Sequence, residues 1–307
     1  KKVLMYQSYI YLIYIDLPII IAMGLECMYK KKTDKEHILD NPDTYTGSME
    51  LTNIESFTIN DKTQKIEKQN IENITMGVYK LFDEAVVNCR DHAIRLLQSN
   101  NVDCKKMTYI SITIDNDGAI VFENDGDGID IVEHPTYGTM IPEMIFFHLR
   151  TGTNYNKNEK SIVGGKNGFG SKLIFIWSVY GSIETVDRVR KLKYYQKCYN
   201  NLDIIEPPTV VSYDGLPFTR IKFKLDYSRM GLIGLSPNMI SLFRRRVYDL
   251  AALVPNTVKV IYNTKLIKIN TFKKYVNMYL EKGTPCIHQK NGRWEFAVCK
   301  SNNGFQH

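Results

Sequence analysis

The stretch Phe82-Asp83-Glu84-Ala85-Val86-Val87-Asn88 lies at the centre of a long run with helical periodicity. Between Ile74 and Leu97, apolar residues recur at intervals of three and four, as they do on one face of an α-helix. This apolar set is Val78, Leu81, Phe82, Ala85, Val86, Cys89, Ala93 and Leu96. Spacings of i, i+4, i+7 and i+11 place Glu84, Asn88, Asp91 and Arg95 together on another stripe. The sequence therefore predicts an amphipathic helix over 74–97 with a polar stripe of unusual composition.

This polar stripe has two interpretations. It can be a solvent-exposed face, although such faces usually carry Lys and Glu, and Asn is a poor helix former. Alternatively, Glu84 can act as a general base, the Asn88 amide oxygen can ligate Mg²⁺, and Arg95 can neutralise phosphate. The helix alone leaves both interpretations open.

A second polar element, Asn124-Asp125-Gly126-Asp127-Gly128, follows a predicted hairpin. One strand of that hairpin runs from 107 to 115 and the other ends at Glu123. The Asn124 side-chain oxygen can accept a hydrogen bond from an adenine amino group, and two glycines would let the backbone approach a flat base. An ordinary turn is the alternative, since Asn, Asp and Gly are the commonest turn residues.

The third element is the glycine-rich loop 164–172, which precedes a helix predicted over 173–179. Backbone amides of such a loop at a helix N-terminus form a cradle for phosphate. The loop lacks the Gly-Lys-Ser/Thr triplet of a P-loop, and the charged loop before it excludes a dinucleotide fingerprint. A flexible hinge is the alternative, but Lys166 and Lys172 favour phosphate.

The remaining pattern fixes the expected fold class. Residues 52–70 predict a hairpin around Asn60-Asp61, and further strands are expected near Ile183, near Tyr194, over 219–224 and over 258–262. Short helices are expected over 141–149 and 241–253, the latter opened by Ser236-Pro237. This mixed succession predicts an α+β fold of two layers, with a mixed β-sheet and helices on one face.

Composition limits the function only loosely. The chain has 307 residues and a net charge of +7, and basic runs at 30–32 and 244–246 suit either a polyanion or a solvated face. The six cysteines are scattered, and no second ligand pair accompanies Cys286 and His288, which argues against zinc. We expect reduced thiols in an intracellular protein.

The beginning of the chain resembles a signal peptide or membrane anchor, because Lys1-Lys2 precedes an apolar run over 9–24. Asp16 and Pro18 interrupt this run, and it shows no small-residue cleavage site. We expect instead an extension upstream of a start at Met23. Residues 1–22 should contribute nothing to the fold, and no stable membrane partner is expected.

The order of the three polar elements is the signature of the ATPases that include gyrase, the Hsp90 chaperones, histidine kinases and MutL. Their surroundings resemble type II DNA topoisomerases of eukaryotes and large DNA viruses, over residues 29–307. The matching segments are 29–33, 36–39, 42–48, 82–88, 151–155, 164–172, 245–249, 275–280 and 293–295. The resemblance implies the Bergerat-type fold of this group, also named GHKL.

The resemblance also implies ATP and Mg²⁺ as cofactors. Glu84 would polarise the attacking water, Asn88 would hold the metal against the phosphates, and Asn124 would contact adenine. The other implied ATP-binding residues are Asp91, Arg95, Thr151, Thr153, Asn154, Gly165, Lys166, Asn167, Gly168, Phe169, Gly170, Ser171, Lys172 and Thr219, with Tyr29 reaching into the partner subunit's site. The sequence departs from many relatives at two positions, where His92 replaces Asn and Lys166 replaces Arg.

The implied domains are an extension over 1–28, an ATPase domain over 29–280 and the start of a transducer domain over 281–307. The implied function is ATP-driven closure of a homodimer, the gate for passage of double-stranded DNA and relaxation of supercoils, in the nucleus or a viral replication compartment. Without the transducer lysine that senses the γ-phosphate, the fragment is expected to be weakly active or inactive. The alternatives are an ATP-binding and dimerisation module without turnover, and another GHKL ATPase of Hsp90 or MutL type.

Overall fold

The first described helix, α2 (Asp34–Asp40), is fixed by its own N-terminal residues. The computed structural model describes residues 29, 31–151, 168–292 and 294–300, and the chain divides into two units, residues 1–41 and 42–307. At the start of α2, Glu36 N donates to Thr33 Oγ1 at 3.2 Å and Thr33 N donates to Glu36 Oε2 at 2.7 Å. This reciprocal capping box satisfies amides that have no partner within the helix.

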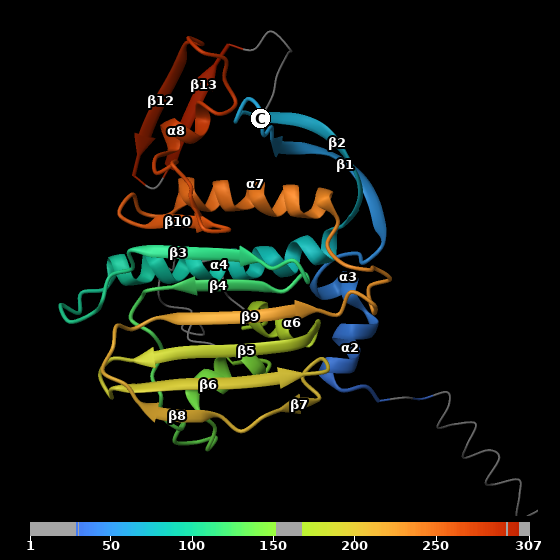
Figure 1. The fold of residues 1–307 in the computed structure, drawn as a ribbon, viewed down its shortest axis with the longest axis vertical. Helices are drawn as coiled ribbons and strands as arrows, with labels where there is room; N and C mark the ends of the chain where they lie inside the picture. Colours follow the sequence, from blue (N-terminus) through green and yellow to red (C-terminus); the bar gives the residue numbers. More distant parts are fainter. Residues whose placement is uncertain (1–28, 30, 152–167, 293, 301–307) are drawn as a thin grey trace, which may run out of the picture. The chain divides into compact units, whose positions relative to one another are not determined.

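The second unit contains a nine-stranded mixed sheet (Figure 1). Its strands are β3 (Tyr109–Ile114), β4 (Ile120–Asn124), β5 (Ser178–Asp187), β6 (Leu192–Tyr199), β7 (Ile204–Ile205), β8 (Thr209–Ser212), β9 (Thr219–Leu225), β10 (Lys259–Tyr262) and β11 (Lys265–Leu266). The order across the sheet is β11-β10-β3-β4-β9-β5-β6-β7, and β8 also pairs with β6. Only the pair of β10 and β3 is parallel among these described strands. The predicted mixed sheet is confirmed.

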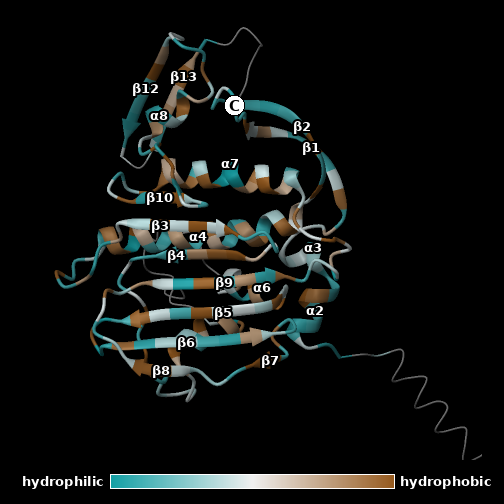
Figure 2. Cartoon of the chain, in the orientation of Figure 1, coloured by the Kyte–Doolittle hydropathy of each residue, from teal (hydrophilic) through white to brown (hydrophobic). Residues whose placement is uncertain are grey.

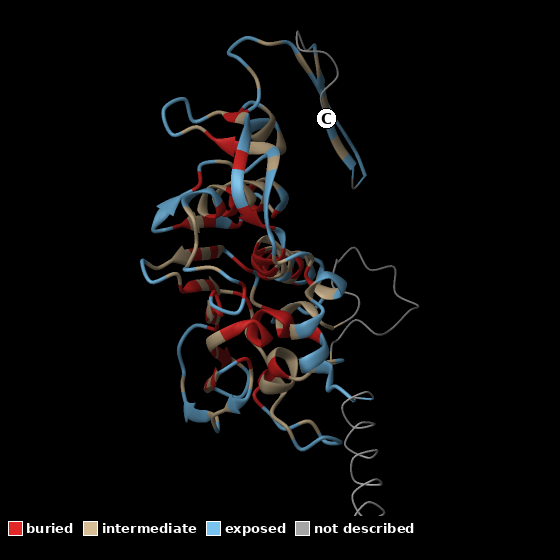
Figure 3. Ribbon diagram, turned by 90° about the vertical axis from the view of Figure 1, so that its right-hand side faces the viewer, coloured by how far each residue is buried: buried red, intermediate tan, exposed pale blue. Residues whose placement is uncertain are grey.

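Four helices accompany this sheet, namely α4 (Met76–Gln98), α5 (Ile141–Phe147), α6 (Gly170–Ile176) and α7 (Pro237–Leu253). Figure 3 shows buried residues gathered where the strands and helices of this unit meet. All eight residues of the predicted apolar face of α4 are buried. Phe82 of α4 stacks on Phe243 of α7 with ring centroids 4.0 Å apart, and its ring lies 5.3 Å from that of Phe122 on β4. Helix α4 is therefore the centre of the core, because it contacts both the sheet and a second helix.

Smaller elements complete the second unit. The short helix α3 (Pro42–Tyr45) precedes the hairpin of β1 (Leu51–Ile59) and β2 (Ile66–Thr75), which packs on α7. Near the end of the described chain, α8 (Phe272–Val276) packs against a second hairpin of β12 (Cys286–Asn291) and β13 (Trp294–Cys299). Figure 2 shows hydrophobic and hydrophilic residues interspersed along the strands, as expected for strands with two different faces.

Four predicted helices have wrong boundaries: α5 ends at Phe147 instead of 149, and strand pairing or capping explains one boundary of each of the other three. Helix α4 begins at Met76 because Ile74 and Thr75 pair with β1. Helix α6 spans 170–176 instead of 173–179, because the chain from Ser178 pairs with β9. Helix α7 begins at Pro237 instead of 241, and the Ser236 hydroxyl caps it by accepting from Met239 N at 3.1 Å.

The apolar run over 9–24 lies outside the described residues. In the part of the chain that the structure describes, no helix combines the length and hydropathy needed to cross a bilayer.

Candidate functional site

The polar stripe of α4 is only partly open to solvent. The Glu84 side chain is 19% exposed and Asp91 is 7% exposed, whereas Asn88 and Arg95 are exposed. Lys80, one turn earlier, donates to Glu84 Oε1 at 2.6 Å. The sequence analysis missed Lys80, although its i, i+4 spacing to Glu84 is the signal for such a pair. The low exposure of Glu84 shows that it does not lie on an ordinary solvent-exposed face.

The start of α6 lies directly on Glu84. A Cβ added to Gly170 would overlap Glu84 Oε2, so a larger residue at this position would displace the carboxylate. Because α4 and α6 pack against each other, the carboxylate helix and the end of the glycine-rich loop meet in space. These two elements are more than 80 residues apart at Glu84 and Gly170, and only the tertiary structure brings them together.

Lys172 on α6 carries a charge in a buried position. Its side chain is 3% exposed, and its Nζ donates to the Thr151 carbonyl oxygen at 2.6 Å. Burial lowers the pKa of Lys172 from its ordinary 10.5 to about 8, because a buried ammonium loses its hydration. No carboxylate pairs with it within the described residues. An anion placed beside this group would restore the stabilisation that burial removes.

Other predicted residues of this region have structural contacts. The Thr151 hydroxyl donates to the carbonyl oxygens of Met144 at 2.6 Å and His148 at 2.8 Å, which closes the end of α5. The Ser171 hydroxyl donates to the Ile145 carbonyl oxygen at 3.1 Å. The Ser171 hydroxyl therefore links α6 to α5, and the Thr151 hydroxyl links residue 151 to the end of α5.

The remaining predicted residues of the glycine-rich loop are only partly described. The Phe169 ring lies 6.2 Å from that of Tyr45 on α3, and Gly168 has a φ of +66°. Five predicted residues lie outside the described part of the chain, namely Thr153, Asn154, Gly165, Lys166 and Asn167. Tyr29 is described and is exposed.

Asn124 and Thr219 lie side by side where the adjacent central strands β4 and β9 meet the turn 124–128. They are direct partners in the register of β4 and β9, and Asn124 is 6% exposed. The Asn124 Oδ1 accepts from Gly126 N at 3.2 Å, while the Thr219 and Thr185 hydroxyl oxygens lie 3.0 Å apart. The structure thus brings two predicted adenine-side residues together, although they are separated by nearly 100 positions in the sequence.

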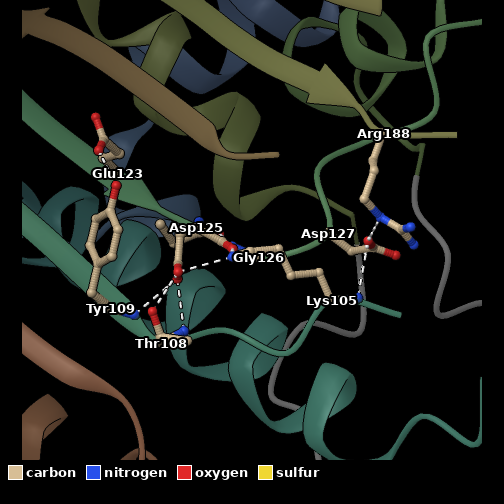
Figure 4. Close-up of polar contacts among 9 residues, drawn as sticks. Lys105, Thr108, Tyr109, Glu123, Asp125, Gly126, Asp127 and Arg188 are labelled. Carbon is tan, nitrogen blue, oxygen red and sulfur yellow. Dashed lines mark hydrogen bonds and ion pairs between the residues drawn. The ribbon is translucent and has the colours of Figure 1, made fainter. Parts of the chain in front are cut away.

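Asp125, the next residue, is fully engaged by the protein (Figure 4). Its Oδ1 accepts from the amides of Thr108 at 2.7 Å and Tyr109 at 2.9 Å. Its Oδ2 accepts from Thr108 Oγ1 at 2.5 Å and from Lys105 Nζ at 2.9 Å. Burial raises the pKa of Asp125, but these hydrogen bonds outweigh that effect and hold the pKa below its usual range. Asp125 therefore fastens the turn to β3.

Asp127 is engaged in the same way. Its Oδ1 accepts from Lys105 N and from Arg188 Nε, each at 3.2 Å (Figure 4). Of the three polar side chains of the turn 124–127, two are carboxylates that hold the turn in place. Asn124 is the side chain that can still serve a ligand, because its described hydrogen bond leaves the second lone pair of its oxygen and both amide protons available.

The glycines of this turn allow close packing within the protein. Gly128 has a φ of +77°, and a Cβ at this position would overlap the Val186 carbonyl oxygen of β5. A Cβ on Gly126 would lie 2.7 Å from His92 Nε2 of α4. Close packing against α4 and β5 gives these glycines a structural reason, and the expectation that they also make room for a flat base stays a prediction.

His92 and Arg95 form a pair on α4 beside this turn. Arg95 Nη2 lies 2.9 Å from His92 Nδ1, and a guanidinium can only donate, so Nδ1 must accept. Burial and the charge of Arg95 lower the pKa of His92 from 6.5 to about 4, which keeps the ring neutral at pH 7. The ring proton then resides on Nε2, the nitrogen that faces Gly126. His92 is a donor towards the corner that also holds Asn124.

The basic run 244–246 does not present three free cations. Arg244 pairs with Asp61, Arg245 with Asp249, and Arg246 Nε with Asp83 Oδ1 at 2.6 Å. A polyanion at this run would have to compete with these carboxylates. Among the described residues, no group of three or more His, Cys, Asp or Glu side chains could hold a metal ion.

This arrangement of sheet, helices and polar residues matches solved structures. The crystal structure of the ATPase region of Saccharomyces cerevisiae topoisomerase II superposes with a TM-score of 0.84 and 37% identity, over 91% of this chain and 72% of that chain. The chain belongs to the family of topoisomerase II ATPase regions. The ATPase and transducer domains of DNA topoisomerase II from Balamuthia mandrillaris give a TM-score of 0.82 at 31% identity, over 90% of this chain and 69% of that chain.

Longer relatives named DNA topoisomerase 2 agree. DNA topoisomerase 2 of Acanthamoeba polyphaga mimivirus is 40% identical over 265 residues, and that of Saccharomyces cerevisiae is 36% identical over 298 residues. These matches cover 85% and 91% of this chain, which spans about 20% of the length of either relative. No family model matches the chain. The family and the α+β fold predicted from the sequence are confirmed.

Proposed function

We propose that this chain is the ATP-binding and ATP-hydrolysing part of a type II DNA topoisomerase. The observation that carries the proposal is the position of α4, which meets the start of α6 at Glu84 and the turn after β4 at His92. In this proposal Glu84 is the catalytic carboxylate, the start of α6 faces the phosphates, and the turn after β4 faces adenine. Membership in the topoisomerase II family supports ATP as the nucleotide.

In this proposal Glu84 accepts the proton of the attacking water. Its low exposure and its ion pair with Lys80 fix the position of the carboxylate, as general base catalysis requires. Bound Mg²⁺ would neutralise phosphate charge, and the exposed amide of Asn88, one turn after Glu84, would provide an oxygen ligand. The exposed Asn88 side chain fits this role because a single protein oxygen is enough when phosphates supply other ligands.

The other residues of the site would bind the nucleotide. Asn124, with Thr219 beside it, would contact adenine, and His92 and Arg95 would donate hydrogen bonds along the same side. Lys172 would contact phosphate, supported by its buried charge without a carboxylate partner in the described chain. We further assign ATP contacts to Asp91 and to the described residues Thr151, Gly168, Phe169, Gly170 and Ser171, and extend them to Thr153, Asn154, Gly165, Lys166 and Asn167 from the resemblance.

In the whole protein, ATP binding would close a homodimer around double-stranded DNA, and hydrolysis would reset it. Tyr29 would reach the partner subunit's nucleotide, since it lies ahead of α2 and is exposed. We retain residues 29–280 as the ATPase domain and 281–307 as the start of a transducer domain. The protein would act in the nucleus or in a viral replication compartment, where its DNA substrate is found.

Calorimetry of the chain with ATP–Mg²⁺ and with GTP–Mg²⁺ tests the proposal. We expect ATP to bind and GTP to bind at least about tenfold more weakly, because guanine presents a carbonyl where adenine presents an amino donor to Asn124. Sedimentation with a non-hydrolysable ATP analogue tests dimer closure on the same samples. Binding without closure or turnover would support a nucleotide-binding module, and equal affinity for both nucleotides would overturn the adenine site.

A further inference from the structure

Two cysteines face each other across the hairpin of β12 and β13. Cys286 and Cys299 are direct partners in its antiparallel register and form its last pair. Both are free thiols with intermediate exposure. Their separation of 13 positions in the sequence hides this relation, which arises only from the strand register.

The register also defines the type of pair. Asn291 and Trp294 are direct partners with two residues between them, and Gly292, the first of these, has a φ of +57°, as the commonest two-residue hairpin turns require. The pair that brackets such a turn exchanges both backbone hydrogen bonds, and the two pair types then alternate along the hairpin. Cys286 and Cys299 lie five pairs beyond Asn291 and Trp294, which makes them a non-hydrogen-bonded pair. In such pairs the Cα atoms are about 4.5 Å apart, within the range of about 4.4–6.8 Å found in disulfides.

The other described thiols are in a different environment. Cys89, Cys104 and Cys198 are buried, and burial raises the pKa of Cys89 and of Cys198 to about 12. A thiol that stays protonated is a poor nucleophile, so these two are expected to be inert. Cys286 and Cys299, in contrast, can be reached by a small molecule.

The surroundings of the pair suit an anionic reagent. Cys286 and His288 line a pocket together with Lys273 of α8 and Ala297 of β13. The ammonium of Lys273 adds positive charge to this pocket and attracts a negatively charged disulfide such as oxidised glutathione. The same face of the hairpin therefore offers both the two thiols and a place for the oxidant.

We propose that Cys286 and Cys299 form a reversible, redox-sensitive disulfide across this hairpin. The thiolate of one cysteine attacks oxidised glutathione, which forms a mixed disulfide and releases one reduced glutathione. The second thiolate attacks the protein-side sulfur of that mixed disulfide, forms the Cys286–Cys299 bond and releases the second glutathione. Each protein thiol loses its proton to solvent and each glutathione thiolate gains one, so the dithiol is oxidised and glutathione disulfide is reduced.

The new bond would lock the open end of the hairpin. Its other face exposes the apolar side chains Ile287, Trp294, Phe296 and Val298. Fixing the strand ends holds this face in one register, whereas the reduced hairpin can fray from the end opposite its turn. The inference is independent of the proposed nucleotide function.

Native mass spectrometry and peptide mapping test the proposal. The full chain is incubated with oxidised glutathione, free thiols are alkylated, and the digest is analysed without reduction. We expect a peptide pair joined through Cys286 and Cys299, which dithiothreitol separates, together with a raised melting temperature for the hairpin-linked protein. Cys286→Ser and Cys299→Ser should each leave one glutathione attached to the remaining thiol, and Cys104→Ser should keep the cross-link.

Three outcomes would overturn the proposal. Alkylation of both cysteines in the wild-type protein after incubation would show that they do not react. A stable glutathione on each cysteine would show that the second exchange is geometrically blocked. A disulfide between two chains, which increases with protein concentration, would assign the thiols to an intermolecular contact.

Discussion

The turn 124–128 and the segment 168–172, which includes the start of α6, differ in how the protein satisfies their charged residues. In the turn after β4, the carboxylates of Asp125 and Asp127 accept six hydrogen bonds from four residues, and Asp125 has a lowered pKa. In α6, Lys172 is buried with one carbonyl oxygen as its described partner, and its pKa is lowered to about 8. A charged group that accepts several hydrogen bonds from the protein stabilises the fold. A buried charged group with a single hydrogen bond can still gain stabilisation from a ligand of opposite charge.

The largest effect is expected at Glu84, which belongs to the α6 side of this comparison. Glu84→Gln retains size and hydrogen bonding but removes basicity, so ATP should still bind while phosphate release falls about 10²–10⁴-fold. Phosphate release is measured on a chain extended at its carboxyl end to include the transducer, alongside nucleotide affinity and cross-linked dimer.

Lys80→Gln is the matched control, because it removes the ion pair and leaves the carboxylate in place. It should reduce the rate far less than Glu84→Gln. If phosphate release by Glu84→Gln stays within about threefold of wild type, well under the general-base range, Asp91 becomes the candidate base.

The next effect concerns Lys172. Lys172→Met removes a charge-assisted hydrogen bond to phosphate, worth about 1.5–3 kcal/mol, so ATP affinity should fall roughly 10- to 150-fold. In the absence of nucleotide, the same change should leave the protein at least as stable as wild type at pH 7, because the buried ammonium is itself unfavourable. Calorimetry and denaturant unfolding measure the two quantities. A parallel loss of affinity and stability would show that Lys172 is structural.

The pH dependence gives an independent test of the same group. The unfolded chain keeps the Lys172 proton up to about pH 10.5, while the folded chain releases it near pH 8. Between these values the unfolded state binds more protons, so the Lys172 contribution to the free energy of unfolding rises with pH. The free energy of unfolding of wild type minus that of Lys172→Met should therefore increase from pH 8 to 10.5. A difference that does not change with pH would contradict the lowered pKa.

On the adenine side, Asn124→Ala should weaken ATP binding by about 1–3 kcal/mol through loss of the base contact. Asn124→Asp is the control, because it keeps an oxygen that accepts from Gly126 N and from an adenine amino group. It should bind ATP more tightly than Asn124→Ala. Equal ATP affinity for wild type and Asn124→Ala in calorimetry would remove Asn124 from the site.

The smallest effect is expected at the neighbouring position and should appear in stability alone. Asp125→Asn replaces an oxygen acceptor and a negative charge that together receive four hydrogen bonds, and should lower the free energy of unfolding by about 1–2 kcal/mol. Because the folded pKa of Asp125 is lowered, this advantage of wild type is present above its ordinary pKa of 3.8 and is lost as pH falls below it.

Asp130→Asn is the control for that experiment, since Asp130 pairs with Arg190 at an exposed position and should change stability little. Urea unfolding at pH 7 and at acidic pH measures the difference. If Asp125→Asn changed nucleotide affinity without loss of stability, Asp125 would serve the ligand and would not be the residue that stabilises the turn.

Much of the fold follows from local pattern. The eight apolar residues of α4 were predicted from spacing alone and are all buried, since helical geometry repeats every few residues. The hairpins of β1 with β2 and of β3 with β4 also follow from neighbouring residues and turn signals. One error occurs where distant segments pair, at the end of α6, because the chain from Ser178 pairs with β9. The wrong start of α7 instead reflects a local cap at Ser236.

The sequence by itself determined the family, the α+β class and the residue types of the site, because motif order and periodicity are properties of short segments. The tertiary structure decided which of those residues hold the fold and which can serve a ligand. It shows that Asp125 binds the protein's own backbone while Asn124 can serve a ligand. It also buries Lys172 and pairs Cys286 with Cys299 across a hairpin. The reason is physical: burial, hydrogen-bond satisfaction and strand register depend on segments far apart in the chain, and no local pattern contains them.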